Sequence, residues 1–229
     1  MGVIEGTIEK IKYMLVEGQL GPGDRLPVEK DLAARLGVSR NTLREAVRAL
    51  AAIKVLQTRQ GDGTYVTSLA PDLLLDGMAF VADLHRDTGA LQFLHVRRLL
   101  EPEATALAAT RLTDADLERL AELLTEAEAL ASAESVDYEA LVSQDRAFHS
   151  LIVSRCGNPV LAALIENTSS RTIRARVWRG LTEDGVAVAT VSEHRAIYQA
   201  LVERDSERAR LRAVIHIVGV EDALRAAAI

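Results

Sequence analysis

Residues 24–50 read DRLPVEKDLAARLGVSRNTLREAVRAL, and this stretch decides the fold of the first part of the chain. Its two halves are separated by residues 37–39, where a glycine is expected to end one helix and a serine to cap the next. In the second half, apolar side chains recur at helical spacing, at Leu43, Val47 and Leu50. Two short helices separated by three residues predict a helix-turn-helix.

The flanking residues extend this motif to a winged helix. Residues 3–17 carry apolar side chains at helical spacing, which predicts a preceding helix. Residues 55–58 and 64–67 favour strands and flank a glycine-rich turn, which predicts a β-hairpin. We therefore expect an N-terminal winged helix-turn-helix domain with a small hairpin wing over residues 1–69, and a linker that reaches Pro71.

The rest of the chain is predicted to be helical. We expect helices near residues 73–86, 90–111, 114–131, 137–156, 159–181, 187–203 and 206–226. Thr113 with Asp116 predicts a capping box, and Asn158 with Pro159 predicts a helix start. The fold class is thus mainly α, with a C-terminal all-α antiparallel bundle of about seven helices over residues 70–229.

The composition excludes several classes of protein. Apolar residues make up 48% and charged residues 26%, so long disorder is not expected. A single cysteine excludes a disulfide framework, and no apolar run is long enough to span a membrane. The N-terminus lacks a signal-peptide pattern, and the few aromatic residues disfavour stacking on single-stranded nucleic acid. We expect a cytoplasmic protein without a membrane partner.

The charge is uneven along the chain, whose formal net charge is −6. Residues 1–69 contain 10 Lys and Arg against 8 Asp and Glu, a net of +2, whereas the remainder contains 17 against 25, a net of −8. Within residues 38–61, Glu45 is the single acid among five basic side chains. A basic module in an acidic chain suggests nucleic acid as a partner, although a solvated helix face gives the same count.

Three arginines of the second motif helix are candidates for DNA contact. Arg40, Arg44 and Arg48 recur every four residues and therefore share one face. The second helix of a helix-turn-helix enters the major groove with its N-terminal residues at base edges, where arginine suits guanine. We expect Arg40 and Arg44 to contact bases or adjacent phosphates. Asn41 and Thr42 add polar contacts in this interpretation. Arg48 lies farther along the helix and contacts either phosphate or no part of the DNA.

The tip of the hairpin is a second candidate for DNA contact. Gln60 and Gly61 can approach the DNA backbone or the minor groove, because glycine has no side chain to clash. The alternative for the helix is an amphipathic segment whose charges are only solvated.

Four residues of the second part are candidates for binding a divalent metal. Asp145 and His149 are spaced i,i+4 and share a helix face. His194 and His216 lie beside apolar residues on two later helices. Three nitrogen ligands and one oxygen ligand suit Zn, Ni, Fe or Mn better than Ca. The alternative is that the histidines are hydrogen-bonded residues of the bundle core.

Arginines of the second part are candidates for binding an anionic ligand. Arg97 shares a helix face with apolar residues and should be partly buried, so it needs an anion beside it. Either a neighbouring glutamate or a ligand can supply that anion. Four further arginines either line the bundle cavity or form a solvated or dimer-facing stripe: Arg171, Arg174, Arg176 and Arg179.

These motifs together resemble the GntR superfamily of bacterial transcription regulators, in its FadR-like branch with the FCD ligand-binding domain. The first part of the resemblance consists of GDRLPVEKDLA at residues 23–33, VSRNTLREA at 38–46 and RQGDGTYV at 59–66. The second part consists of VRRLLEP at residues 96–102, the Gly157-Asn158 and Glu193-His194 pairs, and Asp145, His149 and His216.

The resemblance implies a homodimer on a double-stranded, pseudo-palindromic operator. It implies a divalent metal, with Zn or Ni preferred over Mn or Fe, that is bound by Asp145, His149, His194 and His216. A small organic acid is the implied effector, and we expect Arg97 to bind it.

The family pattern assigns two further DNA contacts in this part of the chain, and the sequence departs from the pattern at three positions. Arg25 and Lys30 join the expected DNA contacts on the ground of the resemblance, but Lys30 replaces an arginine and therefore suits phosphate better than a base. Val28 stands where a serine usually caps the helix, so that helix should begin less firmly. Lys54 stands where a glycine is common, and it would be strained in a left-handed backbone.

We therefore interpret the chain as a metabolite-responsive, DNA-binding transcriptional repressor and not as an enzyme. Binding of a small carboxylate at the metal would release the palindromic operator. Two alternatives stay open. One is a metal-dependent enzyme, for which no general base or nucleophile is evident beside the metal. The other is a ligand-independent DNA-binding protein whose bundle only dimerises.

Overall fold

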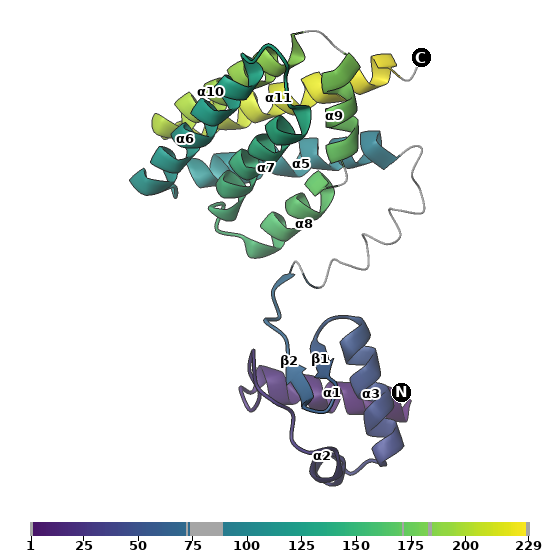
Figure 1. The fold of residues 1–229 in the computed structure, drawn as a ribbon. Helices are drawn as coiled ribbons and strands as arrows, with labels where there is room; N and C mark the ends of the chain where they lie inside the picture. The colour runs from purple at the N-terminus through teal and green to yellow at the C-terminus, as the bar shows by residue number, and fades with distance from the viewer. Residues whose placement is uncertain (1, 72, 74–88, 171, 183–184, 228–229) are drawn as a thin grey trace. The chain divides into compact units, whose positions relative to one another are not determined.

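The computed structural model of the chain describes residues 2–71, 73, 89–170, 172–182 and 185–227 (Figure 1). The chain divides into two compact units, residues 1–77 and residues 78–229. The boundary between these units falls outside the described residues. Among the described helices, none has both the length and the apolar character needed to cross a membrane.

The first unit is a winged helix-turn-helix, as the sequence predicts. Its elements are α1 (Val3–Val16), α2 (Glu29–Leu36), α3 (Arg40–Ala52), β1 (Leu56–Arg59) and β2 (Gly63–Val66). The two strands pair antiparallel, with Leu56 opposite Val66 and Arg59 opposite Gly63. This hairpin is the predicted wing.

Local backbone chemistry sets the ends of the two motif helices. Gly37 ends α2 in a left-handed conformation, with φ of +66°. Ser39 caps α3, because its side-chain oxygen accepts a hydrogen bond from the backbone N–H of Thr42 at 3.0 Å. Val28 precedes α2 without a side-chain hydrogen bond, so α2 begins without a cap, as expected.

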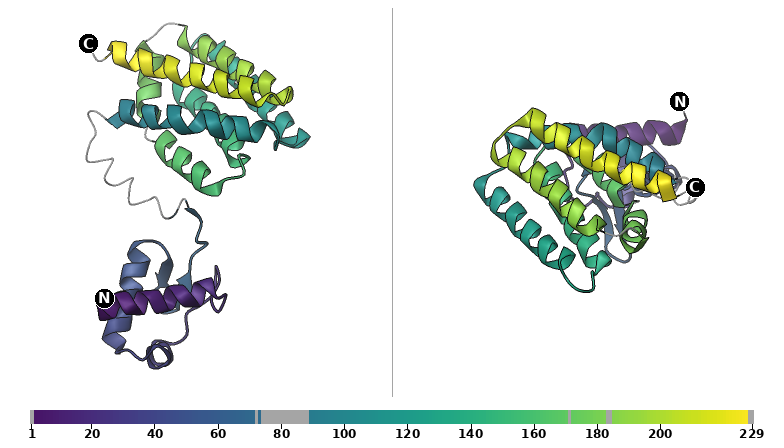
Figure 2. Two further views of the ribbon diagram at one scale, coloured as in Figure 1. Left: turned by 180° about the vertical axis from the view of Figure 1, so that it is seen from behind. Right: turned by 90° about the horizontal axis from the view of Figure 1, so that it is seen from above.

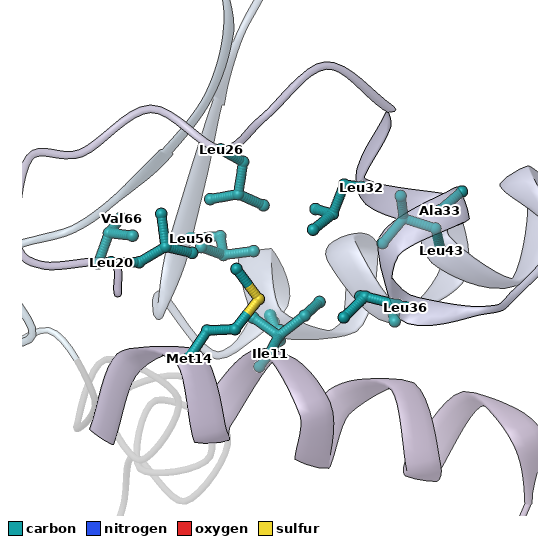
Figure 3. Close-up of a cluster of buried hydrophobic side chains, with 12 residues drawn as sticks. Ile11, Met14, Leu20, Leu26, Leu32, Ala33, Leu36, Leu43, Leu56 and Val66 are labelled. Carbon is teal, nitrogen blue, oxygen red and sulfur yellow. The ribbon is translucent and has the colours of Figure 1, made fainter. Parts of the chain in front are cut away.

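One apolar core holds the first unit together (Figure 3). Ile11 and Met14 of α1 face Leu32 of α2, and residues of all three helices and both strands meet at the centre. The buried members are Ile11, Met14, Leu20, Leu26, Leu32, Ala33, Leu36, Leu43, Ala46, Leu50, Leu56 and Val66. Because α3 buries its apolar face here, its arginine-bearing face is left toward solvent.

The second unit is a bundle of helices, again as predicted. Its described helices are α5 (Gly89–Ala109), α6 (Asp114–Ala131), α7 (Tyr138–Ser154), α8 (Pro159–Ser170), α9 (Ile173–Thr182), α10 (Val186–Val202) and α11 (Ser206–Ala227). Helix α5 packs along α11, and the two views of Figure 2 show them side by side. The contacts continue from α11 to α10, then to α6, to α7 and back to α5, so these helices enclose a common centre.

Two predicted helix starts in the second unit are confirmed. Thr113 and Asp116 form a capping box at the start of α6. The side-chain oxygen of Asn158 accepts hydrogen bonds from the backbone N–H groups of Val160 and Leu161 at 3.1 Å, which caps α8. The helix expected near residues 73–86 lies outside the described residues except at residue 73.

The prediction of a single helix over residues 159–181 is wrong. The structure has two helices there, α8 and α9, with Thr172 in the turn between them. The hydroxyl of Thr172 donates to the backbone carbonyl of Ser169 at 3.0 Å and accepts from Arg97 at 3.3 Å. These side-chain bonds compete with regular helix bonding, and the contact to Arg97 is not visible in the local sequence.

Lys54, the second residue after the end of α3, provides a test of backbone strain. Lys54 has φ of +61°, which is unfavourable for a side chain that carries a Cβ atom. We expect Lys54→Gly to raise the free energy of unfolding of the first unit by about 1 kcal/mol. The measurement is urea unfolding of the full chain. The control is Lys54→Ala, which removes the same charge but keeps Cβ, and an equal gain in both variants would rule out strain as the cause.

Candidate metal centre and nucleic-acid interface

The face of α3 that the sequence assigned to DNA contact lies at the surface. Arg40, Asn41, Arg44 and Arg48 are exposed. Thr42 is half-buried, and its hydroxyl lies 2.8 Å from the Ser39 hydroxyl. The other expected DNA contacts are also exposed, namely Arg25, Lys30, Gln60 and Gly61. This arrangement leaves the predicted face free to meet a large anionic partner.

Two arginines of this face form ion pairs. Arg44 Nε lies 2.8 Å from Glu29 Oε1 of α2, and Arg48 Nη1 lies 2.8 Å from Glu45 Oε1 within α3. The first pair joins two helices, whereas the second joins neighbouring turns of one helix. The sequence places Glu45 among these basic side chains, but it gave no indication that Glu29 lies beside Arg44.

The wing is tied to the segment before α2 by backbone hydrogen bonds. The N–H of Leu26 donates to the carbonyl of Thr64, and the N–H of Val66 donates to the carbonyl of Asp24, both at 2.8 Å. The segment around residue 25 therefore forms an antiparallel bridge with β2, between Arg25 and Tyr65. This pairing fixes where the hairpin lies relative to α2.

Side chains add to the rigidity of the wing. Arg25 donates to the backbone carbonyl of Asp62, and its guanidinium group lies where a Cβ atom on Gly63 would clash, so a larger residue at position 63 would displace the Arg25 side chain. Tyr65 donates its hydroxyl to Asp62 Oδ2 at 2.9 Å, and the Arg59 guanidinium lies 4.4 Å from the Tyr65 ring centre. Arg59 is an exposed cation on the wing that the sequence did not single out.

In the second unit, the four predicted metal ligands meet at the centre of the bundle. Asp145 and His149 come from α7, His194 from α10 and His216 from α11. All four are buried, and one potential ligand atom from each lies within 4.8 Å of the others. His149 Nε2 lies 3.1 Å from His194 Nε2, and Asp145 Oδ1 lies 3.3 Å from His194 Nε2.

Two glutamates orient histidines of this cluster. Glu101 Oε1 lies 2.6 Å from His149 Nδ1, and Glu193 Oε2 lies 2.8 Å from His216 Nδ1. A carboxylate beside Nδ1 favours the tautomer whose Nε2 lone pair is free for a metal. Burial lowers the pKa of His194 and of His216 well below the usual value, so both are held neutral. Neutral imidazole is the form that binds metals.

Arg97 is fully buried and is paired with a glutamate of its own helix. Its Nε lies 2.8 Å from Glu101 Oε2, and its Nη2 lies 3.2 Å from Glu101 Oε1. Its Nη1 donates to Thr172 at 3.3 Å. Burial opposes ionisation of Glu101, but Arg97 and His149 outweigh it and hold the pKa of the Glu101 carboxyl well below its usual range. The sequence left two possible anions beside Arg97, a neighbouring glutamate or a ligand. In the structure Arg97 pairs with the glutamate.

Arg176 of α9 is the arginine with spare hydrogen-bonding capacity at this centre. It is buried and donates from Nη1 to Asp145 Oδ2. Its Nε and Nη2 are shut off from solvent and have no hydrogen-bond partner in the described part of the chain. Burial, reinforced by the positive charge of Arg97, lowers the pKa of Arg176 to about 9. The side chains of Arg171, Arg174 and Arg179 lie outside the described residues.

Two small cavities flank Asp145 and Arg176. One, of about 40 Å³, is also lined by Tyr138, Thr190 and His216. The other, of about 10 Å³, is also lined by Arg97, His149, Glu166 and Ser169. Cavities of this size hold from one to a few water molecules. Arg176 therefore stands between two small cavities beside the histidine cluster.

The chain thus combines a winged helix-turn-helix with a helical bundle that has a buried polar centre. The family of bacterial regulatory proteins named gntR matches residues 4–66, and the FCD domain matches residues 92–219. The chain therefore belongs to the GntR family, in the group that carries an FCD domain. The members of this group that it resembles are named as transcription regulators.

Several known proteins are similar over almost the whole chain. The HTH-type transcriptional regulator LutR of Bacillus subtilis (strain 168) is 33% identical over 216 residues, which cover 92% of this chain and 96% of LutR. The galactonate operon transcriptional repressor of Escherichia coli (strain K12) is 29% identical over 208 residues, which cover 89% of this chain and 88% of that repressor. The solved structure of Streptococcus agalactiae GntR superposes with a TM-score of 0.73 at 29% identity, covering 96% of this chain and 99% of that one.

The buried histidines predict how stability depends on pH. Folding lowers the pKa of His194 and His216, so the unfolded chain binds more protons between the lowered pKa and the usual value of about 6.5. We therefore expect the metal-free protein to lose stability as pH falls below about 6.5. Thermal unfolding over roughly pH 5 to 8 tests this. His216→Gln should flatten the slope, whereas His95→Gln, at an exposed position, should not.

The Arg97–Glu101 pair predicts a strong dependence of stability on one carboxylate. Glu101→Gln leaves Arg97 charged, buried and unpaired, which should cost about 3–5 kcal/mol in the free energy of unfolding. The matched control is the double variant Arg97→Met with Glu101→Gln, which keeps an acceptor for His149 and removes the unpaired charge. Urea unfolding should show that the double variant recovers most of the loss, and additive losses would contradict this account.

Proposed function

We propose that this member of the GntR family is a metabolite-responsive repressor. It binds a palindromic operator as a homodimer and releases it when a small carboxylate binds at a divalent metal in the helical unit. The single observation that carries the effector part of the proposal is the buried edge of Arg176, which has no hydrogen-bond partner among the described residues and lies beside the four clustered ligands. The galactonate operon repressor, a relative of this chain, is named for an operon of a sugar acid.

The donor set suits a transition metal. Asp145, His149, His194 and His216 would hold it, and neutral imidazoles with one carboxylate favour Zn or Ni, with Mn or Fe as alternatives. When bound, the metal supplies a buried positive charge with positions open to a further anion. Glu101 and Glu193 fix the ring orientation of two ligands, which is the usual arrangement around a metal-bound histidine.

The charge balance of the centre favours an anionic effector over a neutral one. Arg97 and Arg176 contribute two positive charges, and Glu101, Asp145 and the half-exposed Glu193 contribute three negative charges. With neutral histidines the net is −1, and a divalent metal changes it to +1. A carboxylate would then neutralise a charge that is expensive to bury.

We assign the direct anion contact to Arg176, and this changes the role expected for Arg97. The donors of Arg97 are engaged by Glu101 and Thr172, so a ligand would have to break a buried ion pair to reach them. Arg176 can bind a carboxylate with Nε and Nη2 without losing its bond to Asp145. Arg97 then contributes positive charge near the ligand and positions Glu101 through their ion pair.

The winged-helix unit would read the operator with α3 in the major groove. Arg40 and Arg44 are assigned to base edges, Asn41 and Thr42 to nearby polar contacts, and Arg48 to phosphate. The remaining assigned contacts to the DNA backbone or minor groove come from Arg25, Lys30, Gln60 and Gly61. A dimer would place two such units on half-sites one helical turn apart.

The test uses an operator selected by the full-length protein from a randomised duplex library. We expect zinc-loaded protein to bind it and a panel of small carboxylates, including galactonate, to weaken that binding by about 5- to 150-fold. His149→Ala should lose zinc and the carboxylate response, and Arg40→Ala with Arg44→Ala should lose the operator but keep zinc.

The effector assignment depends on one further variant and its control. Arg176→Gln should keep zinc and the operator but lose the carboxylate response. Arg195→Gln removes an exposed arginine that pairs with Glu128, and it should keep all three activities. An undiminished response in Arg176→Gln would remove Arg176 from the site. Release of the operator by neutral ligands alone would contradict the carboxylate class.

A further inference from the structure

An acidic side chain lies among the arginines of the proposed DNA-reading surface. Glu29 is the first residue of α2, and its Oε1 lies 2.8 Å from Arg44 Nε on α3. A carboxylate at such a surface repels DNA phosphates and weakens binding to any sequence. Its position beside an arginine that is assigned to a base therefore calls for a physical role.

The geometry of this pair limits how Arg44 can meet a base. Glu29 engages Nε, at the side of the guanidinium group, and leaves the two terminal nitrogens, Nη1 and Nη2, at its end. Arginine reads guanine through two parallel N–H groups directed at O6 and N7. Because the Glu29 carboxylate stands at the Nε side, the end of the guanidinium group is the edge that is open for this bidentate contact.

One atom of this pair is protected from water. The side chains of Glu29 and Arg44 are 36% and 56% exposed, but Glu29 Oε1 is shut off from solvent and has no hydrogen-bond partner among the described residues, so its contact with Arg44 is an ion pair. Both residues line a groove of about 430 Å³ between α2, α3 and the hairpin, next to Arg25 and Thr64. The oxygen that faces Arg44 is thus desolvated, which strengthens its attraction for the guanidinium group.

The second pair on this face lacks these properties. Arg48 and Glu45 are 76% and 51% exposed and lie three residues apart on the same helix. A solvated pair of this kind contributes little and leaves both side chains free to move. Glu45 is therefore a matched control, since it is also an acid on the reading face but orients nothing across two helices.

We propose that Glu29 is a specificity-determining positioning residue, which holds the guanidinium group of Arg44 end-on toward a guanine edge. This inference rests on the proposed function, because it takes Arg44 as a base contact. Glu29 acts in two ways. It weakens binding to all DNA by repulsion, which leaves the ratio between specific and non-specific affinity unchanged. It also prepares Arg44 for the matching base, and this second effect widens that ratio.

The experiment compares two duplexes of equal length at one salt concentration. One is the duplex that wild-type protein enriches from a randomised library, and the other has a scrambled sequence. Glu29→Gln keeps the size of the side chain but removes its charge. We expect it to bind the scrambled duplex more tightly and to lower the ratio of the two affinities about tenfold, within the range of one bidentate base contact. Glu45→Gln should tighten binding to both duplexes equally and leave the ratio of the two affinities unchanged.

A double variant separates positioning from a structural effect. In an Arg44→Ala background there is nothing for Glu29 to position, so Glu29→Gln should tighten both duplexes equally. A residue that only stabilised the start of α2 would instead weaken binding in both backgrounds and would lower the melting temperature. Glu29→Asp keeps a charge at the start of α2 but is too short to hold Nε, so it should lower the ratio without lowering the melting temperature.

The outcomes distinguish this inference from the proposed function. If Arg44→Ala collapses the ratio while Glu29→Gln or Glu29→Asp preserves it, the positioning role is wrong and the base contact stands. If Arg44→Ala itself leaves the ratio unchanged, then Arg44 is not a base contact and both claims fall. A lowered ratio in both Glu29 variants, with equal tightening in the Arg44→Ala background, supports the inference.

Discussion

The helical unit depends on the carboxylate of Glu101, which is fully buried and shared by two partners. One oxygen lies against His149, and both oxygens face Arg97. Through Arg97 the same group reaches Thr172, where the chain turns from α8 into α9. That turn starts the helix that carries Arg176 to Asp145. The buried charge of Glu101 thus connects the histidine cluster with the turn at Thr172 and, through α9, with Arg176.

Much of the fold follows from short-range chemistry that a sequence displays. Gly37 and Ser39 end and start the motif helices through backbone conformation and a local hydrogen bond, so residues 24–50 predict a helix-turn-helix without tertiary information. The i,i+4 spacing of Asp145 and His149 places them on one face. The pairing of these two with His194 and His216 needed the family resemblance, because three helices must converge to bring them together.

What the sequence does not predict depends on contacts between distant elements. The break before α9 is stabilised by Arg97, 75 residues away, and without that break the position of Arg176 could not be inferred. Glu29 and Arg44 are likewise joined by the packing of α2 on α3. The sequence indicates that Glu101 can pair with Arg97, since the two are spaced i,i+4 in one helix. It gives no reason to prefer Glu101 over a ligand as the anion beside Arg97.

The strand-like pairing of the segment around Arg25 with β2 makes the wing and the start of α2 move as one body. In the proposed complex, the distance between the helix in the major groove and the wing over the neighbouring groove is then a fixed length of the protein. DNA has to adjust its groove widths to that length, and the energy of the adjustment differs among base steps. The protein would therefore also select operators by indirect readout. It would favour sequences that deform easily, even at base pairs that no side chain contacts.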